Sequence, residues 1–196
     1  MKKILASLVL FVFFAQNSFA QAQAIRPKSI GISFIINDFV TAQRIRTSSL
    51  SAIIRDKRIA KFKQMSPGVA LTYYKGLSPH IDFAGTLGGS SVNLPLAGNT
   101  FTKQYLLLEA DASANFKMVA ENAKANAYLI AGVGASKYKN IFGAFIPLGG
   151  GIKANLFSGS QAFVQFQYRV PVTPDANNYH FQVSIGVSGI VSKKRA

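Results

Sequence analysis

Charged side chains that could interact with one another recur inside apolar segments of this chain. They alternate with apolar neighbours, so an extended strand would place them on the opposite face from those neighbours. The set comprises Asp82, Glu109, Asp111, Lys153 and Arg169. Because an unpaired ion is costly in a low-dielectric interior, we expect Glu109 and Asp111 to pair with Lys153 and Arg169. Such a network is either a structural plug or a gate whose rearrangement opens a small pore.

Enzymatic chemistry has little support among the residue types. A catalytic site of the triad kind needs a nucleophile, a base and an orienting acid within hydrogen-bond reach, and the chain has two histidines, His80 and His180. His180 shares a face with Ser184 and Ser188, but no carboxylate follows in that segment. Cysteine is absent, and the histidines and carboxylates do not recur at metal-binding spacings. We therefore expect no enzymatic activity, no metal and no cofactor.

Alternation of apolar and polar residues indicates the elements that must position these charges. From Leu106 to Phe116 one parity reads Leu, Leu, Ala, Ala, Ala, Phe, and the other reads Leu, Glu, Asp, Ser, Asn. The pattern recurs in segments of roughly nine to thirteen residues, the strand length that crosses a bilayer at a tilt. The predicted strands are 29–36, 68–77, 80–88, 104–116, 126–138, 144–156, 162–170 and 179–190. The sequence therefore predicts an all-β fold, an eight-stranded antiparallel transmembrane β-barrel with its apolar face toward lipid.

Two residue types inside the predicted strands affect the packing of the barrel. Pro147 lies within 144–156 although a paired strand needs the N–H that proline lacks, so we expect it at a bulge or at the rim. Glycines and serines are frequent on the inward parity, as at Gly149, Gly151 and Ser184. These small residues predict thin packing that leaves room for water inside the barrel.

The N-terminus has the features of a cleaved export signal. Lys2 and Lys3 precede an apolar stretch over 4–14, and Ser18-Phe19-Ala20 supplies small residues for cleavage. Cleavage after Ala22 or Ala24 and an uncleaved membrane anchor are the alternatives. The predicted divisions are a signal peptide over 1–20, a short periplasmic segment over 21–27, an outer-membrane barrel over 28–191 and a basic tail over 192–196.

The formal net charge of +15 favours an anionic partner. For an exported protein this means lipid headgroups or surface polyanions rather than nucleic acid. Positive residues concentrate in the long first outer loop, 37–67, where Thr47 and Ser48 predict the cap of a helix over 49–64. A basic amphipathic helix can lie on an anionic membrane surface, and the alternative is a solvated loop without a target. The candidate contact residues are Arg44, Arg46, Arg55, Lys57, Arg58, Lys61 and Lys63.

Several patterned runs carry a resemblance to a known family. They are GISFIINDF (31–39), LLLEADASANFK (106–117), AGVGASKY (131–138), GAFIPLGGG (143–151), QYRVPV (167–172) and NYHFQVSIGV (178–187). Together they resemble the N-terminal barrel of outer membrane protein A (OmpA)-family proteins, in the form found in Bacteroidetes. The resemblance covers about residues 28–190 and implies an eight-stranded barrel inserted by the barrel-assembly machinery, with no particular ligand.

The sequence departs from that family at its C-terminal end. Family members often continue into a peptidoglycan-binding domain, whereas this sequence ends at Ala196, so we do not expect that anchoring role. The terminal aromatic residue that commonly assists assembly of stand-alone barrels is also missing.

The function that these observations predict is that of a non-enzymatic protein of a Gram-negative cell outer membrane. Its role would be structural or surface-interacting, with at most a narrow pore, and outer-membrane lipids would be its partners. One alternative is a component of an envelope secretion or assembly complex that docks through the barrel or the basic first loop. Another is a soluble periplasmic β-barrel that binds a lipophilic ligand, although outward apolar residues on all eight strands argue against it.

Overall fold

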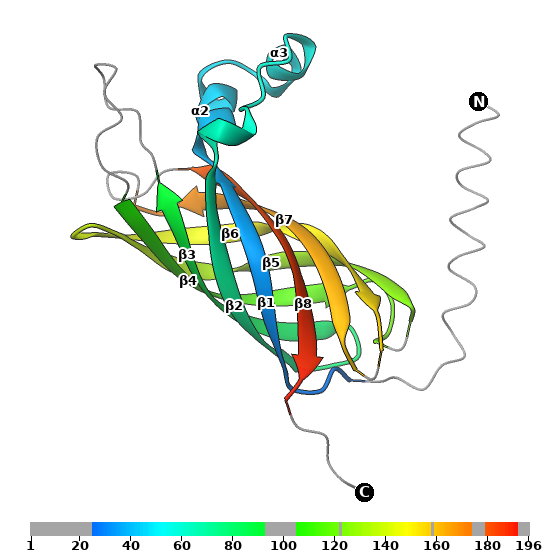
Figure 1. The fold of residues 1–196 in the computed structure, drawn as a ribbon. Helices are drawn as coiled ribbons and strands as arrows, with labels where there is room; N and C mark the ends of the chain where they lie inside the picture. Colours follow the sequence, from blue (N-terminus) through cyan, green and yellow to red (C-terminus); the bar gives the residue numbers. More distant parts are fainter. Residues whose placement is uncertain (1–24, 93–104, 122, 158, 174–178, 192–196) are drawn as a thin grey trace, which may run out of the picture.

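The computed structural model describes residues 25–92, 105–121, 123–157, 159–173 and 179–191. The predicted signal peptide and the basic tail lie outside these ranges. Consecutive strands pair antiparallel, and β1 closes the sheet against β8 (Figure 1). The strands are β1 (Ser29–Asp38), β2 (Ser66–Gly76), β3 (Ile81–Val92), β4 (Tyr105–Lys117), β5 (Ala125–Tyr138), β6 (Ile141–Asn155), β7 (Gln161–Pro171) and β8 (His180–Ile190). The predicted eight-stranded antiparallel barrel is confirmed.

Burial follows the alternation along each strand. On β4, Leu106, Leu108 and Phe116 are exposed on the outer face, while Glu109 and Asp111 are buried in the interior. Among all strand residues, the exposed charged side chains are Lys75 and Lys137, which lie near opposite ends of the barrel. The wall between them is therefore an apolar band around a polar interior, which is the reverse of a soluble barrel. No helix in the described ranges has the length and hydropathy needed to cross a bilayer.

Pro147 lies in the middle of β6 and faces the interior. It is among the fully buried residues and stands opposite Arg169 of β7. Pairing of β6 with β5 is interrupted between the pairs Ala131–Leu148 and Gly134–Phe145, and the register is the same on both sides. The prediction of a bulge or rim position is therefore wrong: the missing N–H interrupts the ladder locally without shifting it.

Aromatic side chains occupy the space that the inward glycines leave. A Cβ atom on Gly151 would come within 2.6 Å of the Tyr128 ring, and one on Gly134 would overlap the Phe145 ring. Tyr128 and Phe145 are both buried, and Phe163 packs edge-on against Tyr74. The prediction of thin packing is wrong at these positions, because the glycines make room for rings.

The first loop contains three short helical elements rather than one helix over 49–64. They are α2 (Phe39–Thr47), α3 (Leu50–Arg55) and the 3₁₀ turn η1 (Phe62–Gln64). Asp38 caps α2 by accepting a hydrogen bond from the Thr41 backbone N–H at 2.8 Å, and Ser49 caps α3. Lys57 takes a left-handed backbone with φ of 51°, and the Arg58 N–H donates to the Ile53 carbonyl, which ends α3 in a Schellman motif. Both helices stand beyond the end of the barrel where β1 ends (Figure 1).

Candidate functional site

Two clusters of charged side chains fill the two ends of the barrel interior. The loop-end cluster lies toward α2 and consists of Glu109, Asp111, Arg169, His180 and Gln182. The terminus-end cluster lies near the first and last described residues and consists of Arg26, Asp82, Lys117, Glu121 and Lys153. Every member of both clusters is buried.

Arg169 on β7 is the centre of the loop-end cluster. Its Nη1 lies 2.9 Å from Glu109 Oε2, and its Nη2 lies 3.0 Å from Asp111 Oδ2. Both carboxylates come from β4. They both face the lumen because residues two apart on a strand share a face. The guanidinium also lies 4.7 Å from the centre of the Phe145 ring. Two carboxylates and one ring therefore hold a single guanidinium, with Glu109 also 3.3 Å from His180 Nε2.

A chain of amides extends this cluster across the interior. Arg169 Nη2 donates to Gln182 Oε1 at 2.7 Å, and Gln182 Nε2 donates to Asn37 Oδ1 at 3.0 Å. Asn37 Nδ2 in turn donates to Ser90 Oγ at 3.0 Å. The connected groups come from β4, β7, β8, β1 and β3, so the network links the wall on several sides of the lumen.

The terminus-end cluster holds two carboxylates among three cations. Lys117 Nζ lies 2.7 Å from Asp82 Oδ1 and 2.8 Å from Glu121 Oε2. Lys153 Nζ lies 3.3 Å from Asp82 Oδ2 and 2.7 Å from Glu121 Oε2. Each lysine therefore bridges both carboxylates, an arrangement that compensates four buried charges at once.

Arg26 completes this cluster from outside the strands. Its guanidinium lies 3.7 Å from Asp82, donates to Ser188 Oγ at 2.9 Å, and stacks 3.8 Å from the centre of the Tyr74 ring. The residue belongs to the segment predicted to be periplasmic, and its buried side chain contacts residues of the barrel interior.

Glu121 also comes from outside the strands, in the connection between β4 and β5. Its carboxylate accepts from Gln161 Nε2 at 2.6 Å in addition to its two lysine contacts. Burial raises the pKa of this carboxyl, but Lys153 and the hydrogen bonds from Lys117, Lys153 and Gln161 outweigh it, so the pKa lies below its ordinary value. The group is therefore held in its charged form.

The predicted pairing is correct for one cation and wrong for the other. Arg169 contacts both Glu109 and Asp111, as expected. Lys153 does not join them, because it lies near the terminus end and pairs with Asp82 and Glu121. Sequence reasoning missed Lys117 although it continues the inward parity of β4, and it missed Arg26 and Glu121 because they lie outside the alternating segments.

The two histidines occupy opposite ends of the barrel. His80 lies between β2 and β3, and its Nδ1 is 3.3 Å from the Lys117 carbonyl oxygen. His180 begins β8, packs against the Phe39 ring with centroids 4.4 Å apart, and contacts Glu109. Within the described ranges, histidines and carboxylates form no group of three that could hold a metal ion.

The basic side chains of the first loop differ in how exposed they are and in whether they already contact other residues of the protein. Arg44 is half-buried and donates to the Arg58 carbonyl at 2.7 Å, so it holds the loop together. Arg46 is exposed and stacks 3.9 Å from the Tyr179 ring centre, and Arg55 pairs with Asp56 at 3.0 Å. The remaining candidate contact residues are all exposed: Lys57, Arg58, Lys61 and Lys63.

No protein-family model matches this sequence, and no curated protein matches it. Among solved structures, the fold is similar to outer membrane protein OprG from Pseudomonas aeruginosa, with a TM-score of 0.57 and 10% identity over 86% of this chain and 98% of that one. It is also similar to the N-terminal β-barrel domain of Pseudomonas aeruginosa OprF, with a TM-score of 0.50 and 10% identity over 85% of this chain and 98% of that one. At this identity the likeness concerns the fold alone. The chain therefore has the closed, OmpA-like barrel fold that is seen in these outer-membrane proteins.

Proposed function

We propose that this protein is a non-enzymatic outer-membrane β-barrel with a structural or surface-interaction role and at most a narrow pore. The observation that carries the proposal is the reversal of faces, with an apolar band outside and ion pairs inside. Lys75 and Lys137 bound the band at its two ends, where charged residues on the lipid face cost least. The proposal includes export by the predicted signal peptide and insertion by the barrel-assembly machinery, as in OmpA-family barrels of the Bacteroidetes form.

The buried ion pairs and aromatic rings of the interior favour the structural role over a constitutive pore. Salt bridges with both partners buried are present at each end, and Tyr128, Phe145 and Phe163 lie buried in the interior as well. Ions crossing the barrel would have to displace both clusters. We expect purified protein in planar bilayers to show no steady conductance at neutral pH, and stable open channels of wild-type protein would refute the plug.

The distribution of charge supports a surface-interaction role. Of the seven acidic residues, Asp82, Glu109, Asp111 and Glu121 are used inside the barrel and Asp38 caps α2. The first loop therefore keeps one exposed carboxylate, Asp56, beside its many cations. Such a surplus attracts polyanions and phosphate-rich headgroups over about one Debye length.

Binding of the basic loop to anions is measurable with the complete protein. Refolded wild-type protein in neutral vesicles should recruit soluble polyanions in a salt-sensitive manner. A variant in which Lys57, Arg58, Lys61 and Lys63 are replaced by Gln should lose most of this binding, whereas Lys124→Gln at the opposite end should keep it. Equal recruitment by the wild-type protein and the fourfold variant would refute an electrostatic role of the loop.

A second candidate, docking to an envelope complex, is favoured by apolar residues exposed on the same loop. Leu50, Ile54, Ile59 and Phe62 are each more than half exposed, next to the cations. Site-specific crosslinking from Ile54 in cells tests it. A discrete crosslinked protein that disappears with Ile54→Ser would support docking, and crosslinks to lipid alone would support the membrane-surface role.

The proposed topology places α2 and α3 outside the cell. Because the chain has no cysteine, single cysteines can report the position of each end. A membrane-impermeant maleimide should label Lys57→Cys in intact cells and Lys124→Cys only after lysis. The opposite pattern would invert the topology.

A further inference from the structure

A groove lies on the outer wall of the barrel over β1 to β6. It is a shallow hollow of about 570 Å³ that stays open on its outer side. Five of its lining residues stand side by side in the sheet register: Val69, Gly89, Leu108, Lys137 and Phe142. The groove is therefore a feature of neighbouring strands rather than of a loop.

Differences in side-chain size create the hollow. Gly89, Ala110 and Ala135 form its floor, while Leu87 and Phe142 project beside it and are each about two-thirds exposed. A second hollow of about 370 Å³ shares Leu71, Leu87 and Ala110 with the first and continues past Tyr73 toward the terminus end. The two hollows adjoin at these three residues and form one continuous apolar depression (the track), which suits an apolar hydrocarbon chain.

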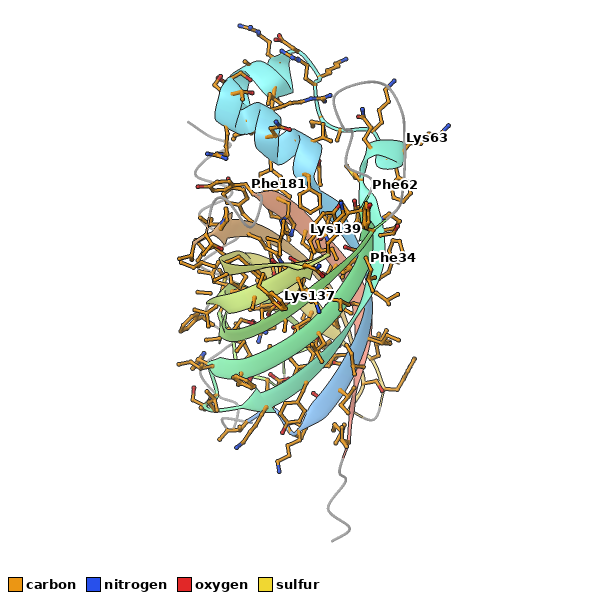
Figure 2. All side chains as sticks on the ribbon, turned by 90° about the vertical axis from the view of Figure 1, so that its left-hand side faces the viewer. Phe34, Phe62, Lys63, Lys137, Lys139 and Phe181 are labelled. Carbon is orange, nitrogen blue, oxygen red and sulfur yellow. The ribbon has the colours of Figure 1, made fainter. Side chains whose placement is uncertain are left out.

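Lys137 places a positive charge at the loop end of this track. It is the last residue but one of β5, and Figure 2 shows it with Lys139 in the half of the barrel nearer the loop helices. Its Nζ lies 5.1 Å from the Phe142 ring centre, and no carboxylate of the described residues forms an ion pair with it. The buried carboxylates form their ion pairs inside the barrel instead: Asp82, Glu109, Asp111 and Glu121. The head of the track is thus complementary to an anionic group.

We propose that the track binds one acyl chain of a phosphorylated glycolipid of the outer leaflet and that Lys137 Nζ contacts its phosphate. The inference rests on the proposed outer-membrane location with α2 and α3 outside. In this proposal the apolar floor and rim contact the acyl chain, and the cation at headgroup level contacts the phosphate. Lys75 offers the same charge at the opposite end of the wall but lines neither hollow, which makes it the matched control.

Native mass spectrometry of the refolded full chain tests the site, with lipid A as the probe. Wild-type protein and Lys75→Gln should bind lipid A equally, and Lys137→Gln should bind it about tenfold more weakly, the factor for one charge-assisted hydrogen bond. Ala110→Leu should weaken binding by filling the track. Dephosphorylated lipid A should bind the wild-type protein as weakly as lipid A binds Lys137→Gln.

Heat-dependent gel mobility of each variant shows that it has folded, and Gly89→Leu replaces Ala110→Leu if the latter does not fold.

Equal affinity of wild-type protein and Lys137→Gln for lipid A would overturn the proposal. Equal affinity of wild-type protein for phosphatidylglycerol and lipid A would also overturn it, because the site would then read a lipid phosphate without the glycolipid. A dimer that Ala110→Leu abolishes without lipid would assign the track to a second copy. The lipid assay uses purified protein, so it is independent of the outer-membrane location. If the outer-membrane fraction shows a heat-shifted band but the purified protein has no preference for lipid A, this binding site is refuted and the proposed location still stands.

Discussion

Replacing Arg169 by Met should destabilise the barrel strongly, because it leaves two buried carboxylates without their cation. Glu109 and Asp111 lie 2.9 Å and 3.0 Å from the guanidinium, and the side chains of all three residues are at most 2% exposed. Removing one partner of a buried ion pair costs about 3–5 kcal/mol, whereas replacing all partners by well-packed hydrophobic residues of similar volume is often close to neutral. We therefore expect Arg169→Met to lower the free energy of unfolding by about 3–5 kcal/mol, and the triple variant with Glu109→Met and Asp111→Leu to recover most of it.

The assay is urea unfolding of protein refolded into lipid vesicles, read as loss of the unboiled gel band, since the chain has no Trp for fluorescence. Arg55→Met is the matched control, because Arg55 is exposed and its pair with Asp56 should contribute only about 0–1 kcal/mol. A loss below about 1 kcal/mol for Arg169→Met, or no recovery in the triple variant, would refute the loop-end cluster as a structural centre.

Three further predictions concern the rest of the interior. Arg26→Ala removes a buried side chain from the terminus end of the interior, so it should raise ion conductance in planar bilayers. Lys28→Ala, at an exposed neighbour, should not raise it, and equal conductance of the two variants would count against the plug. Because the pKa of Glu121 lies below its ordinary value of 4.5, its stabilisation is complete above that pH and is lost as the pH falls through the lower, folded-state pKa. The urea midpoints of wild type and Glu121→Gln should therefore converge on acidification below about pH 4.5, and a constant difference would contradict this. Gly151→Ala should cost about 1–3 kcal/mol because its Cβ meets the Tyr128 ring, whereas Gly189→Ala, with open space around it, should change little; equal unfolding free energies would show that the ring can move.

Much of the barrel was predictable from the sequence, because a strand places alternate side chains on opposite faces whatever its neighbours are. Leu106 to Phe116 illustrates this, since the inward residues are all buried and the outward residues are all exposed except Ala114, which is half-buried. The two helices of the first loop were not predictable as they stand. Asp38 belongs to β1 and also caps α2, and the left-handed Lys57 that ends α3 is not a residue type that signals such a turn.

The charged interior was predictable in composition but only partly in pairing. Parity assigns Asp82, Lys153 and Arg169 to the lumen, yet it gives no information on their height along the barrel axis. That height depends on strand register, which sets Arg169 near Glu109 and Lys153 near Asp82. Arg26 and Glu121 could not be found by alternation, because they reach the lumen from segments outside the strands.

An apolar band that faces lipid should make this barrel resist detergent until it is boiled, and gel mobility of the outer-membrane fraction with and without boiling measures this. We expect the protein in that fraction, with an unheated band that runs at a different apparent mass from the boiled band. Recovery in the soluble periplasm without a heat-dependent shift would contradict this expectation and would mean that the apolar face is not in contact with a membrane.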